Sequence, residues 1–274
     1  QSKTRMMNKK SKLLVFLTSL FLLAVQTTWA QKKAETIPTK WADQAPVIDG
    51  QLNDWKDSLD HYNNSAKLYY SLSNDNENIY LAIKNNSREN LTAILATGIS
   101  FSANIESNKK NPPKITFPII DRTPGKKRNT TEQPEQEEIQ KEILSRIKEV
   151  RVNGFKEIID GGISLYNTYG IKAATGFDSK NNLVQEIAIP LSLLGLQSGN
   201  TEPVSYSIRI NGFQGPAIRQ ERDMYNDMYR GRYGRNYGGM YRGMYGGMPG
   251  GSYTTRPQST AVEFFIRSPL AVKN

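Results

Sequence analysis

Tyrosine is the residue type in this chain that best suits contact with a ligand. The 274 residues include 14 tyrosines but only three tryptophans and a single histidine. A flat phenol ring can stack on the face of a sugar ring, and its hydroxyl group can donate or accept a hydrogen bond. The candidate ligand contacts within the predicted strands and turns are Tyr69, Tyr70, Tyr166 and Tyr169, for which packing within a sheet is the competing interpretation.

Six further candidate tyrosines lie in a low-complexity segment at residues 223–253. A tyrosine recurs there at every fourth position among glycines and arginines: Tyr225, Tyr229, Tyr233, Tyr237, Tyr241 and Tyr245. The glycines disfavour a helix, so we expect a long disordered loop. We interpret it either as a filler loop or as an adhesive surface for a glycan, an envelope polymer or a protein. Four arginines and two aspartates give it a net charge of only +2, and we expect no nucleic-acid partner.

The other reactive residue types do not form a recognisable catalytic site. The chain has no cysteine, which excludes thiol catalysis. The single His61 has no nucleophilic serine motif beside it, and no two carboxylates fall in a recognisable frame for glycoside hydrolysis. We therefore expect a protein that is not an enzyme and has no catalytic residues.

Four acidic residues offer hard oxygen ligands of the kind that calcium prefers. They are Asp54, Asp57, Asp75 and Glu77. Solvated acidic turns explain these residues equally well. We therefore predict no cofactor and no metal site, with a structural calcium ion as the alternative.

The first 30 residues have the pattern of a cleaved export signal. Three lysines precede an apolar run at residues 13–25, and Thr28 and Ala30 occupy the two small positions of a cleavage site. The run is shorter than the roughly 20 residues that cross a bilayer, so we expect no stable membrane span after cleavage. Without a cysteine the signal is not of the lipoprotein type, and we expect a periplasmic or extracellular protein. Cleavage removes five basic residues and no acid, which lowers the net charge from +10 to +5.

We expect the mature protein to begin at Gln31. Mass spectrometry of the protein isolated from its native host should find Gln31 at the N-terminus, in free or cyclised form. Recovery of the intact chain from the cytosol would contradict the prediction of export.

Short apolar runs separated by polar turns predict an antiparallel β-protein. In the clearest pair, residues 68–72 and 79–83 flank the polar turn SNDNEN. Further strands are expected at residues 93–103, 114–120, 162–166, 171–176, 183–189, 204–211 and 261–266. We expect Ile187 and Ile189 to face the core, and Pro190 to end their strand because it cannot donate to the ladder.

One segment predicts a helical insertion at about residues 132–150. Ile139, Ile143, Ile147 and Val150 follow a helical spacing, with acidic residues at the start and basic residues in the later turns. We interpret this segment as a helix packed on the sheets, and a helix that docks a partner is the alternative.

Four successive segments resemble the landmarks of carbohydrate-binding module family 9-like domains: PVIDGQLNDW, LYYSLSNDNENIYLAIKNNS, LVQEIAIPLSLLGL and SYSIRINGF. The resemblance implies an antiparallel β-sandwich, here a single domain at residues 45–274 preceded by a linker at residues 31–44. Within it, Asp49 and Gly50 supply a turn, and Trp55 is expected to seal the core or an edge of the sandwich.

The resemblance also implies a function. Carbohydrate-binding members of the family hold sugar between aromatic platforms, chiefly tryptophans, and tyrosines can substitute for them. We therefore predict a non-catalytic module that binds a polysaccharide or a cell-envelope glycan. The alternative is a structural or assembly factor whose sandwich binds another envelope protein and has no sugar site.

Overall fold

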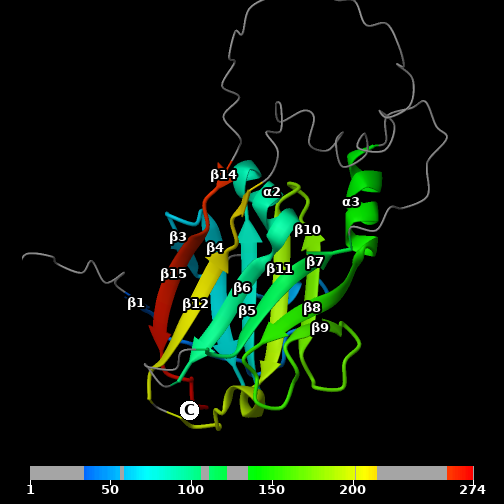
Figure 1. The fold of residues 1–274 in the computed structure, drawn as a ribbon. Coiled ribbons are helices and arrows are strands. Elements are labelled where there is room, and N and C mark those ends of the chain that lie inside the picture. The colour runs from blue at the N-terminus through cyan, green and yellow to red at the C-terminus, as the bar shows by residue number, and fades with distance from the viewer. Residues whose placement is uncertain are drawn as a thin grey trace, which may run out of the picture. The chain divides into compact units, whose positions relative to one another are not determined.

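Two β-sheets pack face to face in the computed structural model (Figure 1). The structure describes residues 34–55, 59–105, 111–121, 135–200, 202–214 and 258–273. The seven-stranded sheet has the order β1–β15–β12–β6–β7–β8–β9. The six-stranded sheet has the order β10–β11–β5–β4–β2, and β3 also pairs with β4. The mainly-β sandwich expected from the sequence is therefore confirmed.

The strand bounds are as follows. The seven-stranded sheet contains β1 (Glu35–Thr36), β6 (Ile99–Asn104), β7 (Lys114–Ile120), β8 (Ile147–Asn153), β9 (Gly161–Ser164), β12 (Val204–Ile210) and β15 (Val262–Ser268). The six-stranded sheet contains β2 (Lys40–Trp41), β3 (His61–Asn63), β4 (Leu68–Asn74), β5 (Asn78–Asn85), β10 (Lys172–Phe177) and β11 (Leu183–Pro190). A separate ladder pairs β13 (Phe213–Gln214) with β14 (Gln258–Ser259). Described strand pairs are antiparallel apart from β1–β15 and β2–β4.

The hydrophobic core lies between the two sheets. In β11, Ile187 and Ile189 are buried in it, and the strand ends at Pro190 as predicted. The short helix η2 (Leu191–Leu194) follows directly and adds Leu191 and Leu194 to the core. Seven further strands, β4, β5, β7, β9, β10, β12 and β15, lie within two residues of their predicted bounds. Alternation of apolar residues is thus a sufficient signal for most of the long strands.

The predicted strand at residues 93–103 is wrong in its first half. Helix α2 (Arg88–Thr97) occupies that part, and β6 begins only after Gly98. Ser87 caps the helix because its side chain accepts a hydrogen bond from the backbone N–H of Asn90. Gly98 ends the helix with a φ of 76°, a conformation that favours glycine. The alternation that predicted a strand begins only beyond this glycine.

The predicted helical insertion at residues 132–150 is shorter than expected. Helix α3 (Gln136–Ser145) ends before β8 begins at Ile147. Val150 therefore lies in a strand, where it pairs with Ile163 of β9. The apolar spacing of the helix continues into the strand, so periodicity alone does not separate the two elements. In the described part of the chain, no helix is long and apolar enough to cross a membrane.

The N-terminal linker expected at residues 31–44 is also corrected where the structure describes it. β1 pairs with β15 and β2 pairs with β4, so this stretch adds a short strand to each sheet. Ile37 between them is buried, and the hydroxyl of Thr39 lies 2.6 Å from that of Ser268. Two-residue strands are too short to show an alternating pattern, which is why the sequence reads as a linker.

The low-complexity segment interrupts the chain between β12 and β15. These two strands pair directly with each other, and the small β13–β14 ladder lies at the points where the chain leaves and returns. The segment is therefore an insertion between two neighbouring strands, as predicted. Residues 223–253 themselves lie outside the described residues.

Candidate ligand-binding surface

Three side chains meet in one row on the outer face of the six-stranded sheet. Tyr62 of β3 pairs with Tyr69 of β4, and Tyr69 pairs with Lys84 of β5. The ring centroids of Tyr62 and Tyr69 are 4.6 Å apart, with the planes tilted by 43°. The Lys84 Nζ lies 5.3 Å from the centroid of the Tyr69 ring, within the range of a cation–π interaction. We call this row the tyrosine–lysine face. Tyr62 is 40% exposed, and the other two residues are half-buried.

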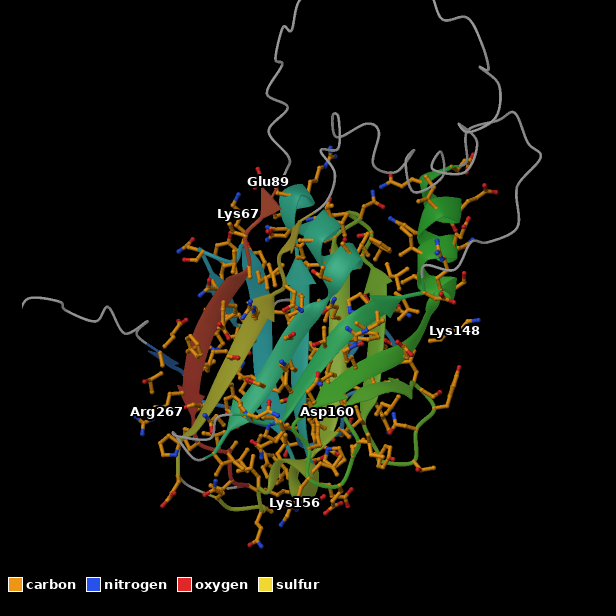
Figure 2. The ribbon with its side chains drawn as sticks, in the orientation of Figure 1. Lys67, Glu89, Lys148, Lys156, Asp160 and Arg267 are labelled. Carbon is orange, nitrogen blue, oxygen red and sulfur yellow. The ribbon has the colours of Figure 1, made fainter. Side chains whose placement is uncertain are left out.

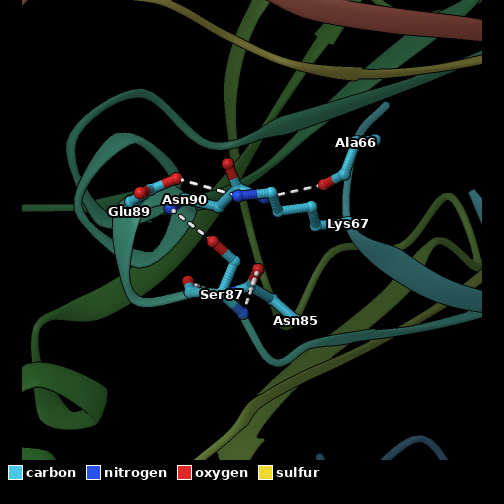
Figure 3. Close-up of polar contacts among 6 residues, drawn as sticks. All are labelled: Ala66, Lys67, Asn85, Ser87, Glu89 and Asn90. Carbon is cyan, nitrogen blue, oxygen red and sulfur yellow. Dashed lines mark hydrogen bonds and ion pairs between the residues drawn. The ribbon is translucent and has the colours of Figure 1, made fainter. Parts of the chain in front are cut away.

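The turn between β3 and β4 is held against the start of α2 (Figure 3). Asn90 Nδ2 donates a hydrogen bond of 2.6 Å to the backbone oxygen of Ala66. Lys67 forms an ion pair of 3.0 Å with Glu89, at the end of the sandwich where α2 lies (Figure 2). Within the turn, Asn63 Oδ1 accepts a hydrogen bond from the backbone N–H of Ala66. These contacts hold the hairpin that carries the two tyrosines.

Asp60 lies immediately before β3 and is already hydrogen-bonded. It accepts hydrogen bonds from Lys40 Nζ and from the hydroxyl of Ser71, which is two residues beyond Tyr69 in β4. Burial opposes ionisation of Asp60, but the two hydrogen bonds and the charge of Lys40 outweigh it. They hold the pKa of Asp60 below its usual value.

Asp178 is a second carboxylate that interacts with this face. It accepts hydrogen bonds from the backbone N–H groups of Lys180 and Asn182 and from the side-chain amide of Asn182. Burial opposes its ionisation, but these hydrogen bonds hold the pKa of Asp178 below its usual value. The positive charge of Lys84 also contributes to the lowered pKa.

A buried carboxylate holds residues 49–55 against the outer face of the same sheet. Glu186 of β11 is fully buried and accepts hydrogen bonds from the backbone N–H groups of Asp49 and Gly50, at 3.2 and 2.7 Å. It also accepts a 2.6 Å hydrogen bond from the indole N–H of Trp55. Burial raises the pKa of Glu186, because the loss of solvent outweighs these hydrogen bonds.

The predicted turn at Asp49 and Gly50 fits closely against β10. Gly50 has a φ of 86°, and a Cβ atom at this position would lie 2.7 Å from the backbone carbonyl of Thr175. Trp55 is half-buried with its indole bonded to Glu186, in agreement with a sealing role rather than an open ligand platform. Glu186 was not among the candidate residues, although a lone acid inside the apolar run LVQEIAIP is a signal for a buried carboxylate.

Tyr166 and Tyr169 lie apart from the tyrosine–lysine face, in the loop between β9 and β10. Tyr166 is 97% exposed and Tyr169 is 41% exposed. Asn167 orders the loop, because its Nδ2 donates hydrogen bonds to the backbone oxygens of Ser164 and Ile171, at 3.0 and 2.8 Å. The competing interpretation, packing within a sheet, is therefore wrong for these two tyrosines.

Tyr70 is not available to a ligand. It is fully buried, its ring packs 5.2 Å from that of Phe264, and its hydroxyl donates a hydrogen bond to Glu35. Successive residues of a strand point to opposite faces, so Tyr69 and Tyr70 cannot serve one surface. The remaining candidates lie outside the described residues: Tyr225, Tyr229, Tyr233, Tyr237, Tyr241 and Tyr245.

Three of the acidic residues considered for calcium, Asp54, Asp75 and Glu77, are described, and they do not form a metal site with other described residues. In the described ranges, no group of three or more His, Asp or Glu side chains could hold a metal ion. Asp75 instead accepts hydrogen bonds from the backbone N–H groups of Glu77 and Asn78, which orders the β4–β5 turn. Asp54 accepts one from the backbone of Val47, and Asp57 lies outside the described residues.

Comparison with known proteins finds similarity of fold. No protein-family model matches the chain, and no curated protein matches it. Solved structures that resemble it include two of a family 9 carbohydrate-binding module from Caldicellulosiruptor kristjanssonii, in complex with glucose and with cellotriose. Each match has a TM-score of 0.33 and covers 65% of this chain. The glucose complex is 10% identical in sequence and is covered over 78% of its length, and the cellotriose complex is 8% identical and is covered over 76%. This likeness concerns the fold alone.

The raised pKa of Glu186 predicts how stability depends on pH. The folded protein binds this proton more tightly than the unfolded chain does. The free energy of unfolding should therefore decrease as the pH rises through the raised pKa. Glu186→Gln removes this titration, so urea denaturation between about pH 4 and pH 8 should give a flatter profile. Exposed Glu157→Gln should keep the native profile, and an equally steep profile for Glu186→Gln would contradict the assignment.

Proposed function

We propose that this chain is an exported, non-catalytic module that binds a polysaccharide or a cell-envelope glycan. The observation that supports the proposal is the tyrosine–lysine face, where an aromatic pair and a cation lie side by side on paired strands. Ligand sites typically combine apolar and aromatic side chains with a few polar groups that orient the ligand. Here the exposed part of Tyr62 supplies the stacking surface, and Lys84 supplies hydrogen-bond donors.

The way in which this face is held also favours binding. Both tyrosines lie on strands, and the turn between these strands is tied to α2 through Ala66 and Lys67. A site on such a support loses little conformational freedom when it binds. More of the interaction energy with a sugar ring then appears as affinity.

Substitution of Tyr62 tests the proposal. Tyr62→Ala should weaken binding to a polysaccharide about five- to tenfold, because it removes a stacking contact of about 1 kcal/mol. Tyr62→Phe retains the ring and should bind nearly as well as the native protein. Affinity gel electrophoresis against a panel of polysaccharides and isolated cell envelope would measure the change.

Tyr166→Ala is the matched control, because this exposed tyrosine lies in the loop between β9 and β10, whereas Tyr62 lies on β3. It should bind polysaccharide like the native protein, and circular dichroism should show that each variant is folded. The proposal fails if the native protein binds no polysaccharide, or if Tyr62→Ala binds every one of them as tightly as the native protein.

A different surface favours a second candidate function, the binding of another envelope protein. β9 is the last strand of the seven-stranded sheet, and a strand at the edge of a sheet can pair with a strand of a partner. The loops before and after β9 carry Ile159 at 91% exposure and Tyr166 at 97% exposure. Exposed apolar side chains beside a sheet edge suit a protein partner better than a sugar.

Paired substitutions distinguish this candidate from glycan binding. If the β9 edge binds an envelope protein, the double variant Ile159→Ser, Tyr166→Ser should no longer retain that protein in a cross-linked pull-down from solubilised envelope. Tyr62→Ala should retain it, since Tyr62 lies in the other sheet. The same set of captured proteins from both variants and from the native protein would exclude an interface at β9.

A further inference from the structure

Lys84 differs from Lys40 and Lys67 in its interactions. Lys40 forms an ion pair with Asp60, and Lys67 forms one with Glu89. The ammonium of Lys84 makes no hydrogen bond or ion pair with any described residue, and it interacts with the Tyr69 ring and, electrostatically, with Asp178. No described residue accepts a hydrogen bond from its three N–H donors, which makes them suitable for a ligand.

From this arrangement we infer that the tyrosine–lysine face selects a polymer that contains acidic sugar units, in which one sugar ring stacks on Tyr62 while the carboxylate of a uronic acid unit in the same polymer binds Lys84. The inference rests on the proposed function and adds the charge of the ligand. Tyr62 and Lys84 lie on the strands on either side of Tyr69, and the Lys84 Nζ is 5.3 Å from the Tyr69 ring. A sugar polymer that lies along this row therefore brings a carboxylate of one of its units toward the ammonium. A charge-assisted hydrogen bond of this kind is stronger than one between neutral groups.

The nearby carboxylates of Asp60 and Asp178 are hydrogen-bonded to groups other than Lys84. Asp60 is bonded to Lys40 and Ser71. Asp178 is bonded to the Lys180 and Asn182 backbone and to the Asn182 side chain. Each of these two acids thus accepts its hydrogen bonds from other donors. Lys84 therefore has no bonded carboxylate among the described residues.

A pair of polymers with one backbone tests the inference. Polygalacturonate carries a free carboxylate on each sugar, whereas its fully methyl-esterified form carries a neutral ester at the same position. Isothermal titration at low ionic strength should show the native protein binding the free acid about tenfold more tightly than the ester. Raising the salt concentration should reduce this preference, because the charges are partly exposed.

Variants of Lys84 assign the preference to this residue. Lys84→Gln should lower affinity for the free acid about tenfold more than it lowers affinity for the ester, because only the free acid loses a charge partner. Lys84→Arg should retain the preference for the free acid. Lys148→Gln is the matched control, because Lys148 is exposed on β8 in the other sheet (Figure 2), and it should bind like the native protein.

The outcomes separate this inference from the proposed function. Equal affinity of the native protein for acid and ester, equal losses with Lys84→Gln and Lys148→Gln, or no binding to either polymer would overturn the acidic-sugar inference. Binding to a neutral polysaccharide that is lost in Tyr62→Ala would still support glycan binding at this face. If the native protein prefers the acid but Tyr62→Ala changes neither affinity, both the inference and the site assignment fail.

Discussion

The hydrogen bonds to the Glu186 carboxylate are the constraint on which the outer face of the six-stranded sheet depends. They join residues 49–55 to β11, and Val184 and Ala188, which face outward on either side of Glu186, are as buried as the core. A buried carboxylate is costly unless donors surround it, and all three of its donors come from this one segment. The segment and the acid therefore need each other: without the acid the donors lose their acceptor, and without the segment the charge is left unpaired.

The outer surface of the six-stranded sheet is partly exposed at the tyrosine–lysine face. In β4, the inward residues Leu68 and Tyr70 fill the core, while Tyr69 between them faces outward and belongs to the tyrosine–lysine face. The pairing of β3, β4 and β5 alone decides which outward side chains become neighbours. A shift of one residue in the β3–β4 register would turn Tyr62 toward the core side of the sheet and so remove it from the tyrosine–lysine face.

Sequence patterns predicted the sandwich, most long strands, the turn at Asp49 and Gly50, and the inward direction of Ile187. They did not separate α3 from β8, because an apolar spacing that suits a helix continues into the strand. The candidate surface was only partly predictable. Tyr69 was a candidate, but its partner Tyr62 lies in a polar stretch and becomes visible only through cross-strand pairing. The lone acid in LVQEIAIP signals a buried carboxylate at Glu186, but its partners were not predictable, because backbone and indole N–H donors carry no opposite charge that the sequence would show.

The position of the low-complexity segment has a consequence for how this fold can vary. β12 and β15 pair along their length although Ile210 and Val262, which lie opposite each other, are 52 residues apart in the chain. The ladder requires only that the two ends of the intervening chain meet. The entropy cost of bringing them together grows by only about 0.6 kcal/mol for each doubling of length. Descendants of this sequence could therefore lengthen, shorten or replace the repeat without altering either sheet, which makes this junction the place where new surface chemistry can be acquired most freely.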